Sequence, residues 1–276
     1  MTDPTVSVII PTYNWSSVLR YAIQSVLWQT FQDFELLLVG DGCTDDSAEV
    51  AASFGDARIR WHNLPRNSGN QSAPNNFGIE QARGRYIAYL GHDDLWYPNH
   101  LERMVGACEE LHADFACSIV VMIGPPPSGV RVVKGAVGPL EPGTLAPPSG
   151  TMHLRAVVAK IGGWKDYRTV WRNPDTDFVY RAMEAGFHFV STRELTVYKF
   201  NSSLRKNSYI EKPFHEQAAY HRRIENDRWF LTEEILEIMR VHLRRLPMQT
   251  PVRQPPPQPH TPGWEVAQYR RFRGLE

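Results

Sequence analysis

The sequence predicts an α/β protein with a mostly parallel central sheet flanked by helices. Two observations predict this fold class. Short apolar runs, typical of strands buried on both faces, recur through the first 120 residues. Between them lie stretches of about ten to fifteen residues in which the apolar residues have helical spacing. This is the pattern of repeated strand–helix–strand units.

Five apolar runs define the strands of the first half, and helical patterns separate them. The strands are expected at Val6–Ile10, Phe34–Val39, Arg58–Leu64, Tyr86–Leu90 and Phe115–Ile123. The helices are expected at Ser16–Gln29, with Ser16 as N-cap, and at Asp45–Phe54, Ser72–Ala82 and Pro98–Leu111. Because parallel sheets bind ligands at the carboxyl ends of their strands, the loops PTYNW, GDGCTDDS and GHDDLW are the expected place for chemistry.

The second half is less regular. Gly124–Gly150 contains seven prolines and six glycines and is interpreted as a long irregular connection over a site, with one strand-like piece, VRVVKGAV. Pro213–Leu243 has a long helical pattern, and Pro247–Pro262, with seven prolines, is expected to be an extended linker. The segment after it is basic and aromatic. We therefore divide the chain into residues 1–124, 125–246 and 247–276.

Composition excludes several classes of protein. The 30 basic and 30 acidic residues balance, which argues against a basic nucleic-acid-binding protein. The longest nearly apolar run, Phe115–Gly124, is half of the roughly 20 residues of a membrane span. Three scattered cysteines without a C-x-x-C motif argue against a cysteine zinc site or a disulfide framework. We expect a cytoplasmic protein without a transmembrane segment.

Acidic residues follow two of the predicted strands. Asp41 comes after FELLLV, and Asp93 and Asp94 come after YIAYL. Neighbouring carboxylates raise each other's pKa, and a divalent cation removes that cost. Mg²⁺ usually takes one or two carboxylates and leaves other positions to phosphates, so the pattern suggests a nucleotide-diphosphate site. An alternative of equal weight is that Asp93 and Asp94 form only a turn and a helix N-cap.

Fingerprints of other nucleotide-binding classes are missing. No G-x-G-x-x-G follows the first strand, and no G-x-x-x-x-G-K-[ST] occurs, which argues against NAD(P) enzymes and P-loop NTPases. The segment VSVIIPTYNWSSVLRYAIQSVLWQTFQDFELLLVGDGCTDDS instead resembles the opening of family 2 glycosyltransferases of the GT-A fold. The resemblance continues in register over Thr5–Leu111, and a weaker block includes IGGW and PDTDFVYRAMEAGFHF.

The resemblance implies a function and a set of site residues. Residues 1–124 would be the nucleotide-sugar-binding half, 125–246 the acceptor-binding half with a C-terminal helix, and 247–276 a linker and tail. Donor-binding roles fall on Pro11, Thr12, Tyr13, Asn14, Asp41, Asn76, His92, Asp93 and Lys199. Asp93 matches the metal-binding Asp of the D-x-D motif, which implies Mn²⁺ or Mg²⁺. Asp175 matches the general base of the family, and Asp177 is expected to pair with Arg181.

Four positions depart from the family pattern. Gly40 and Gly91 stand where the family usually has Asp, Pro174 replaces the Glu before the general base, and Asn75 replaces a common Arg. His92 or Asp94 is expected to compensate for the missing acid at position 91. The leading hypothesis is a metal-dependent, inverting glycosyltransferase that uses a nucleotide-diphospho-sugar, with UDP-sugar as the default, in polysaccharide or glycolipid synthesis.

Two alternatives remain. One is a catalytically degenerate relative that binds a nucleotide, a glycan or an assembly partner, which Gly40, Gly91 and Pro174 motivate. The other is a sugar-phosphate nucleotidyltransferase, against which PTYNW lacks a glycine-rich basic loop. The expected partners are the donor and a glycan or glycolipid acceptor, with no nucleic acid. The tail could cover the active site, touch the inner membrane face or a partner, or be solvated.

Overall fold

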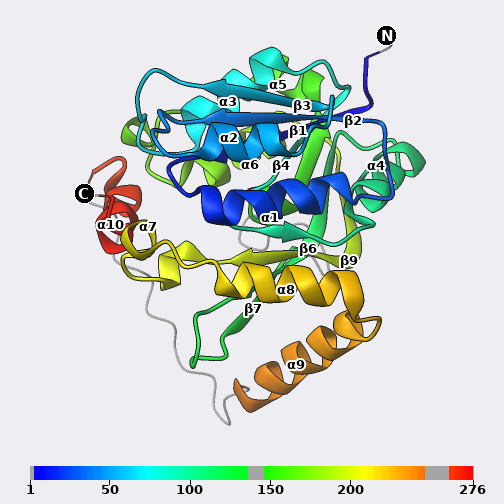
Figure 1. Ribbon diagram of the computed structural model, residues 1–276. Coiled ribbons are helices and arrows are strands. Elements are labelled where there is room, and N and C mark those ends of the chain that lie inside the picture. Colours follow the sequence, from blue (N-terminus) through cyan, green and yellow to red (C-terminus); the bar gives the residue numbers. More distant parts are fainter. Residues whose placement is uncertain (1–2, 136–145, 246–260, 276) are drawn as a thin grey trace.

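The computed structural model describes residues 3–135, 146–245 and 261–275 (Figure 1). The strands are β1 (Val6–Thr12), β2 (Phe34–Gly40), β3 (Ile59–Asn63), β4 (Tyr86–Tyr89), β5 (Leu95–Trp96), β6 (Phe115–Ile123), β7 (Arg131–Lys134), β8 (Thr151–Leu154) and β9 (Phe189–Phe200). The α-helices are α1 (Ser16–Leu27), α2 (Ser47–Ser53), α3 (Ser72–Gln81), α4 (His100–Glu110), α5 (Arg155–Ile161), α6 (Pro174–Glu184), α7 (Ser208–Glu211), α8 (His215–Asn226), α9 (Phe230–Arg245) and α10 (Trp264–Arg273).

These strands form one sheet in the order β3-β2-β1-β4-β8-β6-β9-β5, and β7 pairs with β6. The pairs β1–β2, β1–β4, β2–β3 and β6–β9 are parallel, and the other four are antiparallel. The α/β class is confirmed, but the sheet is mixed rather than mostly parallel by pairing. Among the described strands, six nevertheless point the same way: β1, β2, β3, β4, β6 and β9. Strands β4 and β6 share this direction because each of them is antiparallel to β8, which lies between them in the sheet.

Apolar composition explains why the first two strands are buried. Every residue of β2 is buried, as expected for a strand with helices on both faces. The register pairs Thr12 with Gly40 and Ile9 with Tyr89, so the carboxyl ends of β1, β2 and β4 reach one edge together. Lys199, near the carboxyl end of β9, belongs to the same edge because β9 runs parallel to β6.

The helices are close to the predicted ranges, with three corrections. The residue before α1 is Trp15, so Ser16 is not the N-cap; its N–H donates to the carboxylate of Asp45 from another loop (3.1 Å). The predicted helix from Pro98 begins at His100, after the unpredicted short strand β5. The long helical region after Pro213 is two helices, α8 and α9, separated by residues 227–229.

The remaining predictions for this part of the chain concern the connections. The irregular segment 124–150 contains the strand β7 as the sequence suggested, while residues 136–145 lie outside the described residues. The predicted linker lies mostly within 246–260, which are also outside them. In the described part of the chain, no helix has both the length and the apolar character that crossing a bilayer requires.

Candidate active site

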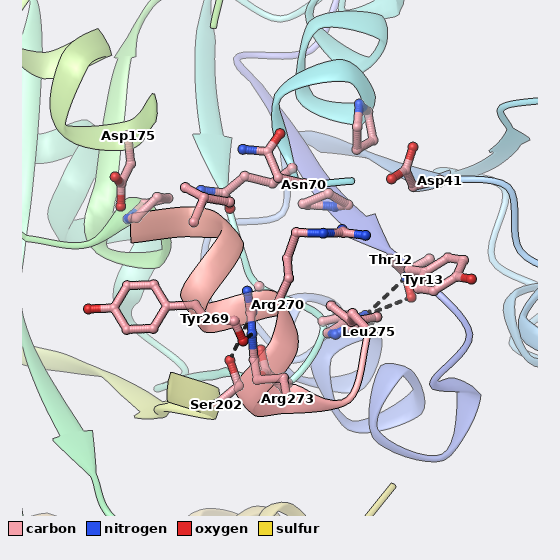
Figure 2. A pocket seen from close by; sticks show the side chains of 18 of the residues that line it. Thr12, Tyr13, Asp41, Asn70, Asp175, Ser202, Tyr269, Arg270, Arg273 and Leu275 are labelled. Atoms are coloured by element: carbon pink, nitrogen blue, oxygen red, sulfur yellow. Dashed lines mark hydrogen bonds between the residues drawn. The ribbon is translucent and has the colours of Figure 1, made fainter. Parts of the chain in front are cut away.

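A cavity of ≈ 380 Å³ lies at the edge where the parallel strands end (Figure 2). Its size is within the usual range of ligand pockets. Eight of the ten predicted site residues line it: Pro11, Thr12, Tyr13, Asp41, His92, Asp93, Asp175 and Lys199. They come from the loops and ends of β1, β2, β4 and β9 and from the start of α6. The sheet therefore brings together residues that are distant in the sequence.

The loop after β1 is held by His92. The ring nitrogen Nδ1 lies 2.8 Å from the Thr12 hydroxyl and accepts from the N–H of Tyr13 (3.4 Å), which places the proton of the neutral ring on Nε2. Nε2 then donates to the hydroxyl of Tyr209, from α7, at 3.2 Å. Burial lowers the pKa of His92 to about 4, against the opposing charge of Asp94. A neutral His92 therefore fixes the loop, and both of its nitrogens are engaged.

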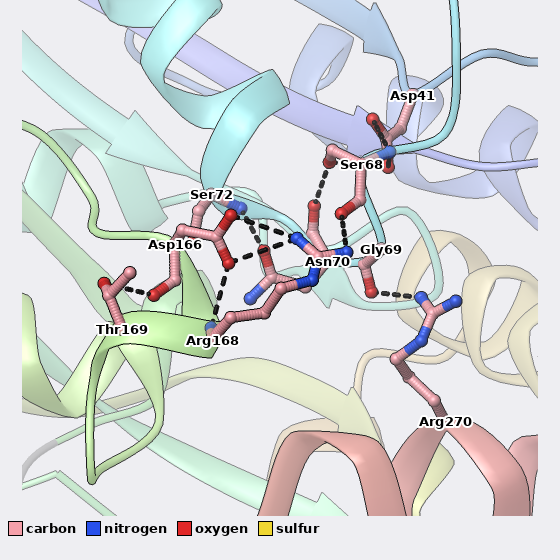
Figure 3. Close-up of polar contacts among 9 residues, drawn as sticks. All are labelled: Asp41, Ser68, Gly69, Asn70, Ser72, Asp166, Arg168, Thr169 and Arg270. Carbon is pink, nitrogen blue, oxygen red and sulfur yellow. Dashed lines mark hydrogen bonds and ion pairs between the residues drawn. The ribbon is translucent and has the colours of Figure 1, made fainter. Parts of the chain in front are cut away.

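Asp41 is buried next to this loop, where its N–H donates to the carbonyl of Thr12 (2.8 Å). Its side chain is held by the loop after β3. Its carboxylate accepts hydrogen bonds from the backbone N–H and hydroxyl of Ser68 (both 3.0 Å) and from the side chain of Asn67 (3.0 Å). Burial raises the pKa of Asp41, while the Ser68 hydrogen bonds and the charge of Arg270 act to lower it. The geometry fits a carboxylate fixed in position beside a ligand (Figure 3).

Asp93 and Asp94 are adjacent but face different surroundings. Asp93 lines the cavity, and no hydrogen bond from a described residue reaches its carboxylate. Asp94 is fully buried and accepts from Lys199 Nζ (2.8 Å), the Ser149 hydroxyl (2.5 Å) and the Phe200 N–H (3.1 Å). Burial alone would lower the pKa of Lys199, but the carboxylates of Asp94 and Asp93 raise it, so the lysine stays protonated.

This arrangement corrects the expectation that His92 or Asp94 replaces the missing acid at position 91. Both ring nitrogens of His92 are engaged in hydrogen bonds, and the carboxylate of Asp94 forms an ion pair with Lys199. Neither side chain is therefore available to take the place of an acid at position 91. The same packing explains the glycine at position 91, because a Cβ there would lie 2.8 Å from the fixed Oδ2 of Asp94. Gly40 is similarly confined, since a Cβ would lie 2.5 Å from the side-chain oxygen of Asn63. Neither position can accept Asp without movement of its neighbours.

The fit of a divalent cation can be judged from these side chains. Within residues 3–135, 146–245 and 261–275, no three His, Cys, Asp or Glu side chains gather as a metal site. Among the described residues that follow β4, Asp93 is the one that presents a carboxylate to the cavity. One carboxylate is sufficient for Mg²⁺ or Mn²⁺ when phosphates and water supply the other ligands. The residues therefore fit a cation that binds together with a diphosphate.

Asp175 lies across the cavity from Asp41, in the first turn of α6 (Figure 2). Pro174 precedes it at the start of the helix, where the missing N–H of proline costs no hydrogen bond. Burial raises the pKa of Asp175, against hydrogen bonds from Thr176 and the charge of Lys199. Asp177 points elsewhere and binds Arg181 at 2.8 Å, which confirms the predicted pair.

Asn14 and Asn76 are the two predicted residues that do not line the cavity. The side-chain oxygen of Asn14 accepts from the N–H of Thr44 (2.7 Å), so Asn14 holds the loop after β2. Both ends of the Asn76 amide bind the backbone of Trp164, at 2.7 and 2.8 Å. Asn76 therefore joins α3 to the IGGW segment, and its predicted donor contact is not supported by this geometry.

The sequence reasoning missed the part of the cavity wall that comes from the tail. Tyr269, Arg270, Arg273 and Leu275, on and just after α10, line the cavity, with Tyr209 from α7 (Figure 2). The basic and aromatic composition of the tail was the available signal. Composition alone left open whether the tail covers the site, and the position of α10 favours that alternative.

Comparison with known proteins identifies the family of the chain. Residues 7–158 match the family described as Glycosyl transferase family 2. The chain belongs to this family. A glycosyltransferase named EpsE from Bacillus subtilis is 30% identical over 198 residues, which cover 69% of this chain and 71% of the relative. An uncharacterized glycosyltransferase of Rickettsia typhi is 37% identical over 109 residues, which cover 40% of this chain but only 33% of the relative.

Solved structures that hold nucleotide sugars show the same fold. Staphylococcus aureus TarS in complex with UDP-GlcNAc has a TM-score of 0.62 and 18% identity, over 88% of this chain and 72% of that one. The mannosyltransferase PcManGT from Pyrobaculum calidifontis, in complex with GDP-Man and Mn²⁺, has a TM-score of 0.56 and 14% identity, over 98% of this chain and 70% of that one. The GT-A fold of this family 2 chain is thereby confirmed.

Proposed function

We propose that this family 2 chain transfers a sugar from a nucleotide-diphospho-sugar to an acceptor hydroxyl, with inversion at the anomeric carbon. The observation that carries the proposal is the placement of Asp93 and Asp175 around one cavity at the carboxyl ends of the strands. Relatives named glycosyltransferases and solved structures that hold UDP-GlcNAc or GDP-Man support it. We propose a glycan or glycolipid as acceptor, in polysaccharide or glycolipid synthesis.

In the proposed reaction, Asp175 is the general base. Its carboxylate takes the proton of the acceptor hydroxyl as that oxygen attacks the anomeric carbon, and the nucleoside diphosphate leaves. A raised pKa makes Asp175 a better proton acceptor than an exposed carboxylate, as long as it remains ionised. Thr12, Tyr13 and Asp41 would hold the nucleoside. A cation bound through Asp93 would neutralise charge on the leaving diphosphate.

Melting temperatures with candidate ligands test this proposal. The full chain is mixed with UDP, GDP, dTDP or CDP, each with Mn²⁺ and with EDTA. A ligand at 100 times its Kd stabilises the folded state by about 2.7 kcal/mol, which raises the melting temperature by several degrees. We expect one nucleotide to do so, with a larger shift in Mn²⁺, and the matching sugar nucleotide to be turned over. Failure of all four to shift the melting temperature would contradict the proposal.

A second candidate function is binding without turnover. Two observations favour it: Asp94 is ion-paired with Lys199, and position 91 is glycine. Among the described residues at the end of β4, Asp93 is therefore the one whose carboxylate lines the cavity. Such a protein would bind a nucleotide or a glycan, or act as a partner in the assembly of a complex. Sugar transfer or donor hydrolysis that Asp175→Asn abolishes would reject this candidate. A nucleotide-dependent melting shift without turnover, for any acceptor tried, would favour it.

A further inference from the structure

The C-terminal helix α10 is packed against the cavity. Val266 is buried, and the N–H of Gly263, just before the helix, donates to the carbonyl of Val170 (3.0 Å). At the other end, the carbonyl of Phe272 accepts from the N–H of Asn207 (2.9 Å). Contacts at both ends therefore hold one face of α10 towards the strand-end loops (Figures 1 and 2).

The charges of the cavity wall depend on this helix. Among the described residues, the lining contains three carboxylates, Asp41, Asp93 and Asp175, and three basic side chains, Lys199, Arg270 and Arg273. The ammonium of Lys199 is bonded to buried Asp94. Without α10 the cavity would be strongly acidic, and its field would repel a diphosphate. The tail therefore supplies most of the positive charge that faces the site.

We propose that Arg270 and Arg273 of α10 bind the diphosphate of the donor nucleotide, so that the tail helix completes the donor site. This inference rests on the proposed function and extends it to residues outside the segment that matches the family, 7–158. Guanidinium groups present planar, paired N–H donors that match phosphate oxygens.

The positions of the two guanidinium groups suit this role. Arg270 donates to the carbonyl of Gly69, in the loop that also holds Asp41, and its charge acts on Asp41 (Figure 3). Arg273 lies 5.8 Å from the centre of the Tyr209 ring, and its charge acts on His92. The guanidinium group of Arg270 thus lies near Asp41, and that of Arg273 lies near Tyr209 and His92.

Contacts with the described residues leave part of the hydrogen-bonding capacity of Arg273 unused. Its Nε donates to the carbonyl of Tyr269 (3.0 Å) and its Nη1 to the hydroxyl of Ser202 (3.4 Å), which uses two of the five N–H groups of a guanidinium. These bonds orient the group without neutralising its charge, because both acceptors are uncharged. An oriented cation at the rim of a cavity is a ready partner for a phosphate.

Calorimetric titration of the full chain in EDTA tests this inference. The ligands are UDP, GDP, dTDP and CDP and the corresponding monophosphates, so that the difference within each pair reports on the diphosphate. The variants are Arg270→Ala, Arg273→Ala and their combination, and Arg271→Ala, on the exposed side of α10, is the matched control. Arg270→Lys and Arg273→Lys keep the charge if an alanine variant folds poorly.

We expect each alanine to weaken diphosphate binding by about tenfold and the double variant by more, with a smaller effect on the monophosphate. Arg271→Ala should bind as the unmodified chain does. Unchanged diphosphate affinity in the double variant would overturn the inference and leave the proposed function standing. Tighter binding would also overturn it, by showing that α10 blocks the site. If the unmodified chain binds none of the nucleotides, with or without Mn²⁺, both proposals fail.

Discussion

The strand-end loops and the tail helix α10 face each other across the cavity, but they are held in place by different means. The loops follow strands whose register is fixed by buried neighbours. Asp94 anchors one loop through two hydrogen bonds from β9 and one from Ser149. Helix α10 contributes one buried side chain, Val266, and is reached through residues 246–260, outside the described residues.

This contrast shows which parts of the site belong to the folding core. Side chains on the strand-end loops share hydrogen bonds with the core, so changing them affects stability as well as binding. Side chains on α10 have few such ties, so changing them should affect ligand binding alone. The contrast can be tested by comparing effects on catalysis and on the free energy of unfolding.

Asp175→Asn should give the largest effect, and on catalysis only. Loss of a general base slows transfer by about 10²- to 10⁴-fold. Asp175 bonds to its neighbour Thr176 rather than to the core, so nucleotide affinity and melting temperature should stay nearly unchanged. Initial rates of transfer, measured beside calorimetry with the nucleotide, check this prediction. Normal transfer by the variant would remove Asp175 from the role of base.

Lys199→Met should give the largest effect on stability. It removes the ammonium 2.8 Å from Asp94, whose carboxylate is fully buried. Breaking a buried pair by removing one partner costs about 3–5 kcal/mol. Urea unfolding measures the loss, and the double variant Asp94→Asn, Lys199→Met is the control, because it leaves no unpaired charge and should recover part of the stability. An unchanged midpoint in Lys199→Met would refute the contrast between loops and tail.

Acid should weaken the core through the buried imidazole of His153. Its Nδ1 donates to the carbonyl of Leu154, its Nε2 accepts from the Tyr89 hydroxyl, and burial lowers its pKa to about 4. An unfolded chain protonates histidine near pH 6.5. Between these two pH values the unfolded state holds more protons, so stability falls as the pH falls.

We expect His153 to account for a loss of about 2 kcal/mol between pH 7 and pH 5. Urea midpoints across this range, compared with those of His153→Gln, isolate its share. The variant has no imidazole at this position, so its stability should depend less steeply on pH. Equal slopes for the two proteins would contradict the assignment.

Much of the sheet and several acids of the site could be predicted, because local patterns carry that information. The run Val6–Ile10 already requires a buried strand, and its parallel neighbours bring Asp41 and Asp93 to one edge. The pairing of Asp177 with Arg181 follows from helical spacing.

The missed features of the site depend on partners that are distant in the sequence. Whether Asp93 or Asp94 faces the cavity is decided by Lys199, 105 residues after Asp94. The role of Asn76 depends on Trp164, 88 residues later. Periodicity and spacing report on neighbours along the chain, so they contain no information about such contacts.

Removal of residues 246–276 should give the smallest effect on stability. Only Val266 of the described tail residues is buried, which corresponds to about 1.5–3 kcal/mol. We therefore expect the shortened chain to unfold cooperatively in urea, with a midpoint above that of Lys199→Met. Loss of cooperative unfolding would show instead that α10 is part of the folding core. A shortened chain that is stable but binds the nucleotide more weakly would show that the two walls of the cavity have different roles. The strand-end loops would belong to the folded core, and α10 would contribute to ligand binding.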